Sequence, residues 1–415
     1  MSEMSYLEKL LDGVEVEWLP LGKLGELVRG NGLPKSDFTE SGVPAIHYGQ
    51  IYTFYGLSTE TTKSFVSHET AKKLKKVNSG DVVITNTSEN FTDVGKALVY
   101  LGKEQAVTGG HATIFKPNST IIGKYFAYFT QTDSFANEKR KYSKGTKVID
   151  VSASDMAKII IPIPCPENPE KSLAIQSEIV RILDKFTALT AELTAELTAE
   201  LTMRKKQYNY YRDQLLSFGE SEVEWKTLGE IAAYSKSRIS FDKLDKNNYV
   251  GVDNLLQNRA GKIQSNYVPT SGNLTEFREG DILIGNIRPY LKKIWQADST
   301  GGTNGDVLVI RSCHKSILPR YLYQILADDN FFEYNMQHAK GAKMPRGNKD
   351  AIMKYRLPIP SFEEQTRIVT ILDKFDTLTN SIRECLPREI ELRQKQYEYY
   401  RDLLFSFPKP EAASN

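Results

Sequence analysis

The sequence predicts two α/β (α+β) domains joined by two long, antiparallel, coiled-coil-like helices, with a pseudo-twofold internal repeat. Arg204–Phe218 and Arg393–Phe407 are identical at 11 of 15 positions, at an offset of 189 residues. Leu183–Phe186 recurs as Leu372–Phe375 at the same offset. Between these shared motifs the two halves of the chain have little in common. Variable and shared segments therefore alternate, which suits a pseudo-symmetric protein that holds two similar objects at once.

Three shorter motifs extend the duplication beyond the helical segments. They recur as Glu15–Trp18 and Glu222–Trp225, as Lys144–Lys147 and Lys340–Lys343, and as Pro162–Pro164 and Pro358–Pro360. The predicted boundaries are a first domain over residues 1–160, a first long helix within 161–218, a second domain over 219–357, and a second long helix with a tail over 358–415. In such a circular layout, the chain after Phe407 is expected to end near the start of the chain.

The composition is that of an ordinary folded protein without membrane spans. Hydrophobic residues make up 40% and charged residues 26% of the 415 positions. No apolar run approaches the roughly 18 residues needed to cross a bilayer, and the start Met-Ser-Glu-Met is unlike a signal peptide. Three widely separated cysteines favour neither disulfides nor a zinc site. We therefore expect a cytoplasmic protein without a membrane partner.

The net charge of +2 is weak for a protein that binds nucleic acid alone. Residues 1–165 carry 19 basic and 18 acidic side chains, and residues 219–360 carry 20 and 16. The shared segments are slightly acidic, with 7 basic and 8 acidic side chains in 166–218 and 8 and 10 in 361–415. If the chain binds DNA, partner proteins are expected to neutralise part of the phosphate charge.

The first long helix is expected to begin at Asn168-Pro169, because Asn caps helices and Pro suits the first helical position. Apolar residues then recur in steps of three and four, which places them on one helix face. This stripe contains Ile175, Ile179, Ile182, Phe186, Leu189 and Leu193. Three Thr-Ala-Glu-Leu units over 190–201 continue it as a spacer stripe of Leu193, Leu197 and Leu201. The helix is expected to end near Phe218-Gly219 after roughly 45 residues, or about 65–70 Å.

The second long helix is expected to begin with a capping box at Ser361–Glu364. Its apolar stripe contains Ile368, Ile371, Phe375, Leu378 and Ile382. Pro387 lies opposite Thr198 of the first copy and predicts a kink or a brief break. Because neither helix can bury its stripe alone, we expect the two to pack together antiparallel. Two unrelated surface helices are the alternative.

The variable segments 19–160 and 226–356 read as two compact α/β domains. Strand-like runs in the first are Asp81–Thr85 and Ala97–Tyr100, and their counterparts in the second are Asp281–Ile284 and Val307–Ile310. Helical patterns occur near 121–141 and 317–336.

Polar residues between the expected strands are candidate DNA contacts. Such side chains hydrogen-bond base edges and phosphates, although ordinary loops contain the same residue types. The candidates are Asn86, Thr87, Ser88, Asn90, Gly109, Gly110, His111, Asn286, Arg288, Tyr290, Lys292, Lys293 and Asn304.

Two basic clusters occupy matching places in the two halves. They contain Lys139, Arg140, Lys141, Lys144 and Lys147 in the first half, and Lys340, Lys343, Arg346 and Lys349 in the second. A charge cluster is often only a solvated surface. The matched placement favours contact with DNA phosphates over that alternative.

Sequence motifs of catalysis are missing. No phosphate-binding loop, dinucleotide-binding fingerprint, zinc-protease motif or Asn/Asp-Pro-Pro-aromatic motif of adenine methyltransferases occurs. The five histidines and three cysteines show no metal-ligand spacing. Glu167, Glu170 and Lys171 faintly resemble a nuclease pattern but lie at an expected helix start. We therefore predict no catalytic residue and no metal site, and recognition rather than catalysis.

Over essentially its whole length the chain resembles the specificity subunits of type I restriction–modification systems. The resemblance rests on Leu-Asp-Lys-Phe at 183–186 and 372–375 and on Gln-Tyr-x-Tyr-Tyr-Arg-Asp at 207–213 and 396–402. It rests further on the two variable domains. The Thr-Ala-Glu-Leu tract between such helices is characteristic of the IC group within that family.

The resemblance implies that each variable domain is a target recognition domain for one half of a bipartite, asymmetric DNA sequence. It implies that the helices set the spacer length and dock two modification (methyltransferase) subunits, and that restriction/translocase subunits join them. S-adenosylmethionine, ATP and Mg would belong to those partners, with no cofactor in this chain. The partner nucleic acid would be double-stranded DNA in the bacterial cytoplasm, where the protein would be nucleoid-associated.

The spacer tract can be compared with the geometry of DNA. One Thr-Ala-Glu-Leu unit adds about 6 Å and roughly 40° of rotation to a helix. One base pair adds about 3.4 Å and roughly 34–36°. The rotation thus matches one base pair, whereas the rise would permit nearly two. Antiparallel helices also predict that the modified adenines lie on opposite DNA strands.

Two other functions remain open at this level. The chain could be a stand-alone DNA methyltransferase or nuclease, although it lacks the corresponding motifs. It could also be a coiled-coil scaffold without a DNA role, although a scaffold would not need two dissimilar domains on near-identical anchors.

Overall fold

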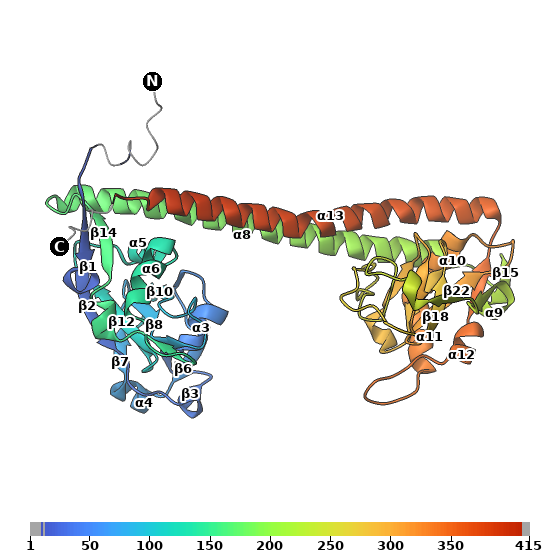
Figure 1. The fold of residues 1–415 in the computed structure, drawn as a ribbon, viewed down its shortest axis with the longest axis horizontal. Helices are drawn as coiled ribbons and strands as arrows, with labels where there is room; N and C mark the ends of the chain where they lie inside the picture. Colours follow the sequence, from blue (N-terminus) through green and yellow to red (C-terminus); the bar gives the residue numbers. More distant parts are fainter. Residues whose placement is uncertain (1–9, 11–12, 409–415) are drawn as a thin grey trace, which may run out of the picture. The chain divides into compact units, whose positions relative to one another are not determined.

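The computed structural model describes residues 10 and 13–408, apart from the side chain of Glu384, and its chain path is shown in Figure 1. It divides into two compact units. Unit 1 contains Met1–Leu193 with Ile390–Asn415, and unit 2 contains Thr194–Glu389. Each unit thus combines one variable domain with the first part of one long helix and the last part of the other. This pairing confirms the predicted antiparallel arrangement. No helix in the described part of the chain is long and apolar enough to cross a membrane.

The domain of unit 1 is built on two five-stranded sheets and two short strand pairs. The first sheet has the order β2 (Gly25–Arg29), β12 (Ala112–Pro117), β8 (Val82–Thr85), β10 (Ala97–Tyr100) and β5 (Ser58–Thr59). The second has the order β3 (Phe38–Thr39), β6 (Ser64–Val66), β4 (Val43–Ile46), β11 (Ala106–Thr108) and β7 (Lys75–Val77). The pairs are β1 (Val16–Pro20) with β14 (Ile160–Pro164) and β9 (Thr87–Ser88) with β13 (Ile149–Asp150).

Short helices complete this domain. They are α2 (Leu21–Leu24), α3 (Tyr48–Thr53), α4 (His68–Lys73), α5 (Gly123–Phe129), α6 (Asp133–Tyr142), α7 (Ala153–Met156) and the 3-10 helix η1 (Lys35–Asp37). Figure 1 shows α5 and α6 between the first sheet and the long helix α8 (Pro169–Leu216). Phe126 and Phe129 of α5 share one buried core with Ile179 and Leu183 of α8, so the domain and its helix fold as one body.

Unit 2 repeats this plan with fewer strands. One sheet has the order β16 (Ala232–Tyr234), β22 (Val307–Ser312), β19 (Ile282–Gly285) and β20 (Ile294–Gln296), and another has β17 (Arg238–Ser240), β18 (Asn273–Phe277) and β21 (Gly301–Thr303). β15 (Glu224–Thr227) pairs with β23 (Arg356–Ile359). The helices are α9 (Leu228–Ile231), η2 (Phe241–Lys243), η3 (Pro289–Leu291), α10 (Pro319–Leu326), α11 (Asp329–Gln337), α12 (Lys349–Met353) and α13 (Phe362–Leu404).

The predicted strands and helices of both variable segments are therefore confirmed. β8, β10, β19 and β22 contain most of the four strand-like runs, and each helical pattern becomes two short helices. The expectation that Val307–Ile310 is the counterpart of Ala97–Tyr100 is wrong, because the sheet orders place β22 where β12 lies and β20 where β10 lies. The repeat is also visible in strand register. Trp18 lies opposite Pro162 in the β1–β14 pair, and Trp225 lies opposite Pro358 in the β15–β23 pair. β14 and β23 span the boundaries predicted at residues 161 and 358, so the first motif Pro-Ile-Pro lies within a strand and the second lies at the end of one.

The ends of the long helices follow the sequence closely. The Asn168 side chain accepts a hydrogen bond from the backbone N–H of Lys171 at 3.1 Å, and that of Ser361 accepts one from Glu364 at 3.2 Å. Glu364 pairs with Arg367. α13 continues through Pro387 as one helix of 43 residues. The predicted break is therefore wrong, and a kink at Pro387 stays a prediction. Proline fixes φ near the helical value, so the helix continues despite one lost hydrogen bond and the crowding of the proline ring against the preceding turn.

Aromatic contacts between the two long helices repeat in both units. In unit 1 the rings of Phe186 and Tyr400 stack at 4.9 Å. In unit 2 the ring of Phe375 stacks on Tyr211 at 5.1 Å. Two members of the predicted stripes, Leu189 and Leu378, are instead 62% and 50% exposed. Leu183 and Leu372 are fully buried, because the domains as well as the partner helix cover these helices and so widen the buried face.

A glutamine on each long helix anchors the domain beside it. Oε1 of Gln176 accepts from the backbone N–H of Ile122 at 2.9 Å, and its Nε2 donates to the carbonyl of Thr120 at 3.0 Å. Gln365 makes the same pair of bonds, with Leu318 at 2.8 Å and Ser316 at 2.8 Å. Both glutamines are fully buried. The same pair of glutamine hydrogen bonds therefore attaches each of the two dissimilar domains to its long helix.

Replacing Gln176 by Ala is expected to lower the free energy of unfolding by about 1–3 kcal/mol, because loss of the side-chain amide leaves the half-buried backbone groups of Thr120 and Ile122 without partners. Gln365→Ala is expected to cost a similar amount. Urea denaturation of the full chain measures both. Arg181→Ala, on the exposed side of α8, serves as the control and is expected to stay within about 0.5 kcal/mol of the original chain. Equal stability of Gln176→Ala and the original chain would contradict the anchoring role.

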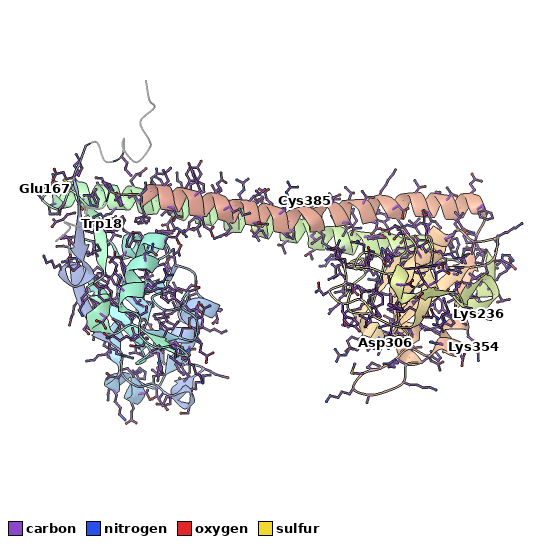
Figure 2. All side chains as sticks on the ribbon, viewed as in Figure 1. Trp18, Glu167, Lys236, Asp306, Lys354 and Cys385 are labelled. Atoms are coloured by element: carbon purple, nitrogen blue, oxygen red, sulfur yellow. The ribbon has the colours of Figure 1, made fainter. Side chains whose placement is uncertain are left out.

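The end of the described chain lies beside its beginning. Trp18 Nε1 donates to the carbonyl oxygen of Pro408 at 2.9 Å. Leu404, Phe405 and Phe407 are buried in the same core as Ile179, and Trp18 lies near the start of α8 (Figure 2). This confirms the expected circular layout as far as Pro408, whereas residues 1–9 and 409–415 lie outside the described residues.

Candidate nucleic-acid interface

In unit 2 three loops that are distant in sequence lie together. They are the loop after β19, the turn before β22, and the hairpin of residues 340–346. The backbone N–H of Asn286 donates to the carbonyl of Asp306 at 2.8 Å, and that of Gly347 donates to Asn286 at 3.1 Å. The N–H of Arg288 donates to the carbonyl of Pro345 at 2.7 Å. Backbone hydrogen bonds therefore fix one composite surface, which includes Asp306 (Figure 2).

Unit 1 assembles the corresponding three loops in the same way. The N–H of Asn86 donates to the carbonyl of His111 at 2.9 Å, and that of Val151 donates to Asn86 at 3.0 Å. β9 pairs with β13, so Ser88 lies opposite Ile149 at the base of the hairpin of residues 144–150. The loops after β8 and before β12 and the 144–150 hairpin thus form the counterpart of the unit 2 surface.

The two hairpins share one geometry. Lys144 and Asp150 exchange two backbone hydrogen bonds of 2.9 and 2.8 Å, and Lys340 and Arg346 exchange bonds of 2.9 and 2.8 Å. The glycine after each first lysine, Gly145 or Gly341, has a φ of 97° or 98°. A side chain is strained in that conformation, which explains why the motif Lys-Gly-x-Lys recurs at these two places.

The predicted contact residues differ in their exposure. The exposed ones are Asn90, His111, Lys141, Lys144, Lys147, Arg288, Tyr290, Lys340, Lys343, Arg346 and Lys349. The half-buried ones are Thr87, Ser88, Gly109, Gly110, Lys292, Lys293 and Asn304, together with the spacer leucines Leu193, Leu197 and Leu201. Asn86 and Asn286 are buried.

The expectation that Asn86 and Asn286 lie on the loop surface is wrong. Asn86 Oδ1 accepts from the hydroxyl of Thr113 at 2.7 Å inside the domain. Asn286 is only 5% exposed. Both residues directly follow a buried strand, and their backbone groups tie the three loops together. Both residues therefore lie beneath the surface and support it, because their buried backbone groups make the hydrogen bonds that join the loops.

Two lysines of the unit 2 loop also turn inward. Lys292 Nζ lies 2.6 Å from a carboxylate oxygen of Asp329. Lys293 Nζ donates to the carbonyl of Val252 at 2.7 Å. Asp329 partly neutralises the charge of Lys292, and the hydrogen bond to Val252 holds the ammonium of Lys293 against the domain. Both are therefore weaker candidates for phosphate contact than the exposed arginine Arg288.

The ammonium groups of the two hairpins are not equally available. Lys144 Nζ lies 2.9 Å from Asp155. Lys158, Lys144 and Ser152 hold the pKa of Asp155 well below its usual range, so this carboxylate stays charged. Arg346 pairs with Asp306 at 2.8 Å. Among the described residues no ion pair is found for Lys147, Lys340 or Lys343, which leaves these three lysines as the available cations.

Three surface residues of unit 1 were missed by the sequence analysis. Arg29 Nε donates to the carbonyl of Gly110 at 3.0 Å, and the ring of Tyr48 lies 4.8 Å from that of His111. His47 packs on Tyr48 at 4.7 Å. Burial, and next Lys35 and His111, lower the pKa of His47. These residues precede His111 by more than 60 positions, so no local pattern connects them.

Lys139 belongs to the core and not to the basic surface, so its prediction as a phosphate contact is wrong. It is 5% exposed, and its Nζ donates to the carbonyls of Phe91 at 2.8 Å and Val94 at 2.5 Å. Burial, assisted by the neighbouring charge of Arg140, lowers the pKa of Lys139 to about 8 from an ordinary value of 10.5.

The lowered pKa of Lys139 predicts a pH-dependent stability. Below about pH 8 the folded and the unfolded chain both hold the proton, whereas between about 8 and 10.5 only the unfolded chain does. The unfolded state then binds more protons, so this residue makes the free energy of unfolding rise with pH across that window, by at most about 1.4 kcal/mol per unit. Urea denaturation at pH 7.5–10 is expected to show a smaller rise for Lys139→Met than for the exposed control Lys141→Met. Equal slopes would contradict the shift.

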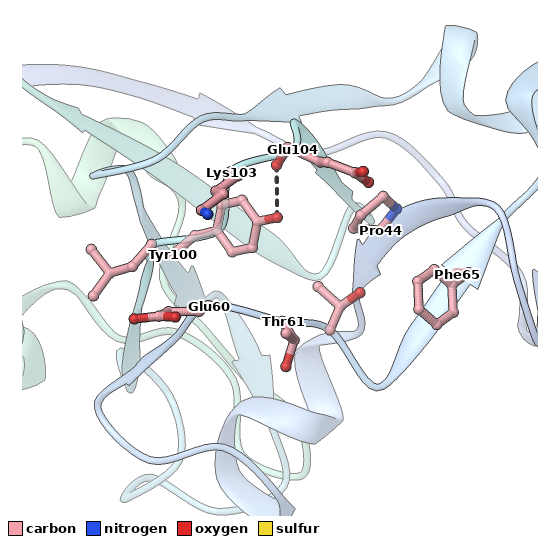
Figure 3. Close-up of a pocket in the computed structure, with 9 residues that line it drawn as sticks. Pro44, Glu60, Thr61, Phe65, Tyr100, Lys103 and Glu104 are labelled. Carbon is pink, nitrogen blue, oxygen red and sulfur yellow. Dashed lines mark hydrogen bonds between the residues drawn. The ribbon is translucent and has the colours of Figure 1, made fainter.

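A cavity of about 480 Å³ in unit 1 lies apart from these loops. Pro44, Phe65 and Tyr100 line it together with charged residues such as Glu60 and Lys103 (Figure 3). The Tyr100 hydroxyl donates to the carbonyl of Glu104 at 2.7 Å. No predicted contact residue lines this cavity. Within residues 10 and 13–408, no group of three or more His, Cys, Asp or Glu side chains is arranged to hold a metal ion.

Comparison with known proteins identifies relatives over the whole chain. The profile of the type I restriction modification DNA specificity domain matches residues 13–203 and 220–392. The specificity subunit of the type I restriction enzyme EcoR124I/EcoR124II from Escherichia coli is 41% identical, with all of both chains covered. The EcoprrI specificity subunit from the same species is 36% identical over 92% of this chain and 93% of its own.

Solved structures share the fold at low sequence identity. A chain from a study of the assembly and conformational transition of the type I R-M system aligns with a TM-score of 0.64 and 16% identity, over 94% of this chain and 97% of that one. The HsdS subunit from Thermoanaerobacter tengcongensis aligns with a TM-score of 0.53 and 14% identity, over 94% and 96%. At such low sequence identity, these similarities show a common fold and nothing further.

Proposed function

Because the chain belongs to the type I restriction–modification specificity subunits, we propose that each of its variable domains reads one half of a bipartite, asymmetric DNA sequence. The subunit recognises the DNA target and is itself non-catalytic, as its relatives are specificity subunits. The resemblance predicted from the sequence is thereby confirmed. A stand-alone enzyme and a scaffold without a DNA role are not favoured.

The observation that supports two half-sites is the paired three-loop surface. Each unit joins the loop after β8 or β19, the turn before β12 or β22, and a Lys-Gly-x-Lys hairpin. The backbone scaffold is shared, whereas the side chains on it differ. His111 and Arg29 lie on one surface, and Arg288 and Tyr290 lie on the other. Equivalent scaffolds with different side chains suit two related contacts with two different base sequences.

Phosphate contacts are assigned to the hairpins. Lys147, Lys340 and Lys343 are exposed cations beside the candidate base-reading loops. Phosphate contacts position a protein on DNA, and base contacts specify the sequence. The proposal therefore gives these lysines a positioning role and gives His111, Arg288 and Tyr290 the reading role.

Matched side chains on the long helices favour two identical partner proteins. Four pairs at the offset of 189 are exposed in both copies, namely Leu189 and Leu378, Met203 and Leu392, Tyr210 and Tyr399, and Tyr211 and Tyr400. In each unit, therefore, four of these side chains are exposed to solvent. One is a leucine in the first part of one long helix, and three are apolar or aromatic residues in the last part of the other long helix. Large exposed apolar and aromatic side chains mark protein-binding surfaces. We assign these surfaces to two modification subunits.

The remaining partners follow from the type of enzyme. Restriction/translocase subunits would join the complex, and S-adenosylmethionine, ATP and Mg would act in partner subunits, not in this chain. The weak net charge of +2 fits a subunit whose partners supply part of the phosphate neutralisation. A cytoplasmic location beside the bacterial chromosome belongs to the same proposal.

The test is to express the chain with its modification subunit and to sequence the methylated adenines of the host genome. We expect one bipartite motif with one modified adenine in each half, on opposite strands. The double variant Lys340→Gln/Lys343→Gln is expected to keep the motif but to weaken DNA binding roughly 10- to 100-fold and to lower the salt dependence by about two charges. Lys236→Gln/Lys315→Gln, with the same loss of charge outside the hairpin, is the control. A motif with no gap, or no sequence preference, would contradict the proposal.

A further inference from the structure

A second kind of site lies in unit 2, away from the three loops. A cavity of about 300 Å³ opens between the domain and the two long helices of that unit. Its cationic lining residues are Lys205, Arg212, Arg259, Lys292 and Arg383, and its carboxylates are Asp329 and Asp376. The lining thus contains five cationic side chains and two carboxylates, an excess of three positive charges. The lining therefore attracts a negatively charged group.

The guanidinium of Arg212 is the most deeply buried cation of this cavity. It is 2% exposed and lies over the ring of Tyr208 at 4.2 Å. Its Nη1 makes only long contacts, 3.4 Å to the carbonyl of Ala327 and 3.5 Å to Asn209, and its Nε has no hydrogen-bond partner. Among the described residues no carboxylate forms an ion pair with it. A buried charge without an ion-pair partner is costly, so an anion bound beside Arg212 would stabilise the folded chain.

The equivalent arginine in unit 1 shows the difference. Arg401 occupies the position of Arg212 at the offset of 189 and pairs with the following residue, Asp402, at 2.8 Å. Asp213 follows Arg212 in the same way, but among the described residues no ion pair joins the two, and burial and the neighbouring carboxylate of Asp328 raise the pKa of Asp213. The arginine of the shared Arg-Asp sequence thus has an ion-pair partner in unit 1, whereas none is found for it in unit 2 among the described residues. The site is therefore particular to unit 2.

Backbone strain is concentrated at the same place. Asn258, Arg259 and Lys292 line the cavity and have φ values of 55°, 60° and 51°. Two backbone hydrogen bonds of 2.9 Å, from Asn258 to Leu291 and from Arg259 to Lys292, lock these segments together. Left-handed conformations of non-glycine residues are costly and gather at functional sites. Here they hold Arg259 and Lys292 on the cavity, where both contact Asp329.

The adjoining space is large enough for more than a single ion. A neighbouring cavity of about 680 Å³ shares Arg259, Asp376 and Arg383 with the first and adds Lys262 and Arg320. The buried hydroxyl of Thr379, in the first cavity, also lacks a hydrogen-bond partner. Arginine forks and a hydroxyl are the groups that bind phosphate oxygens in proteins.

We propose that this cavity binds a phosphate group, supplied either by a free nucleotide or by the DNA backbone. Arg212 and Arg383 would pair with the phosphate oxygens, and Lys205 would add charge at the rim. Lys205 already shows the effect of crowded cations, because burial and the charge of Arg383 lower its pKa. The site is independent of base reading by the three loops.

Thermal unfolding of the full chain, bound to its modification subunits where it needs them, tests the proposal. Inorganic phosphate, ATP without added metal, a short DNA duplex and chloride at equal ionic strength are the probes. Phosphate or ATP near 100 times its dissociation constant is expected to raise the Tm by about 3–6 °C over chloride. Arg212→Gln is expected to lose this shift, whereas Arg401→Gln in unit 1 keeps it.

A double variant, Lys205→Gln/Arg383→Gln, guards against a folding defect, because it leaves the buried Arg212 in place and is expected to weaken phosphate binding at least tenfold. Competition separates the two sources. If DNA displaces the bound phosphate, the natural ligand is a phosphate of the DNA backbone. If ATP binds more tightly than phosphate and does not compete with DNA, the natural ligand is a free nucleotide. No shift with phosphate, ATP or DNA beyond chloride, or equal shifts in both variants, would overturn the proposal. Sequence-specific methylation that persists in that case leaves the recognition function intact.

Discussion

Deletion of Thr194–Leu197 is expected to shorten the gap between the recognised half-sites by one base pair and to leave both half-sites unchanged. α8 runs without interruption from Pro169 to Leu216, and Leu193, Leu197 and Leu201 are all half-buried. Removal of four residues therefore brings an equivalent leucine into the vacated position. The rotation lost is roughly 40°, close to the 34–36° of one base pair.

Methylome sequencing of a host that expresses the deletion variant measures the new gap. Methylation of the original sequence is expected to fall by more than 100-fold, since one half-site moves out of register and each mismatched pair costs about 1–3 kcal/mol. The control is Thr194→Ala/Glu196→Ala, which keeps the helix length and should keep the gap. A changed half-site, or an unchanged gap, would show that α8 does not set the spacing.

A glutamate in place of Tyr210 or Tyr399 is expected to remove one modification subunit each, and the double variant is expected to bind neither. These tyrosines are 60% and 64% exposed, and each belongs to one of the two matched helix surfaces. Exposed tyrosines at interfaces often contribute 2 kcal/mol or more to binding, which is about 30-fold in affinity. Burying a carboxylate there raises the cost further.

Native mass spectrometry of the reconstituted complex gives the stoichiometry directly. Phe54→Glu is the control, because Phe54 is 57% exposed but lies on the domain of unit 1, away from the long helices. Full binding of two modification subunits by Tyr210→Glu/Tyr399→Glu would remove the helix surfaces as docking sites. Loss of both subunits in a single variant would show that the two sites are not independent.

Matched placement was a sound guide to the loops but not to individual side chains. The motif Lys-Gly-x-Lys correctly marked two equivalent hairpins, because a left-handed glycine and flanking cations are local properties. Asn86 and Asn286 are equally well matched, yet both are buried beneath the surface they were expected to form. Lys292 is a similar case, because its side chain turns inward to Asp329, which lies 37 positions away in the sequence. Sequence patterns find such loops but do not reveal which polar groups the fold turns inward.

The sequence alone determined the duplication, the register of the two helices and their capped starts, and its resemblance to a known family indicated the class of protein. These properties depend on periodicity, capping and repeated motifs, which are read over a few turns of chain. Only the tertiary structure decided which loops meet, that Arg29 and Tyr48 join His111, and that Arg212 is left without a carboxylate while Arg401 has one. Such outcomes depend on burial and on contacts between residues far apart in the chain, whose free energies are settled by the whole fold.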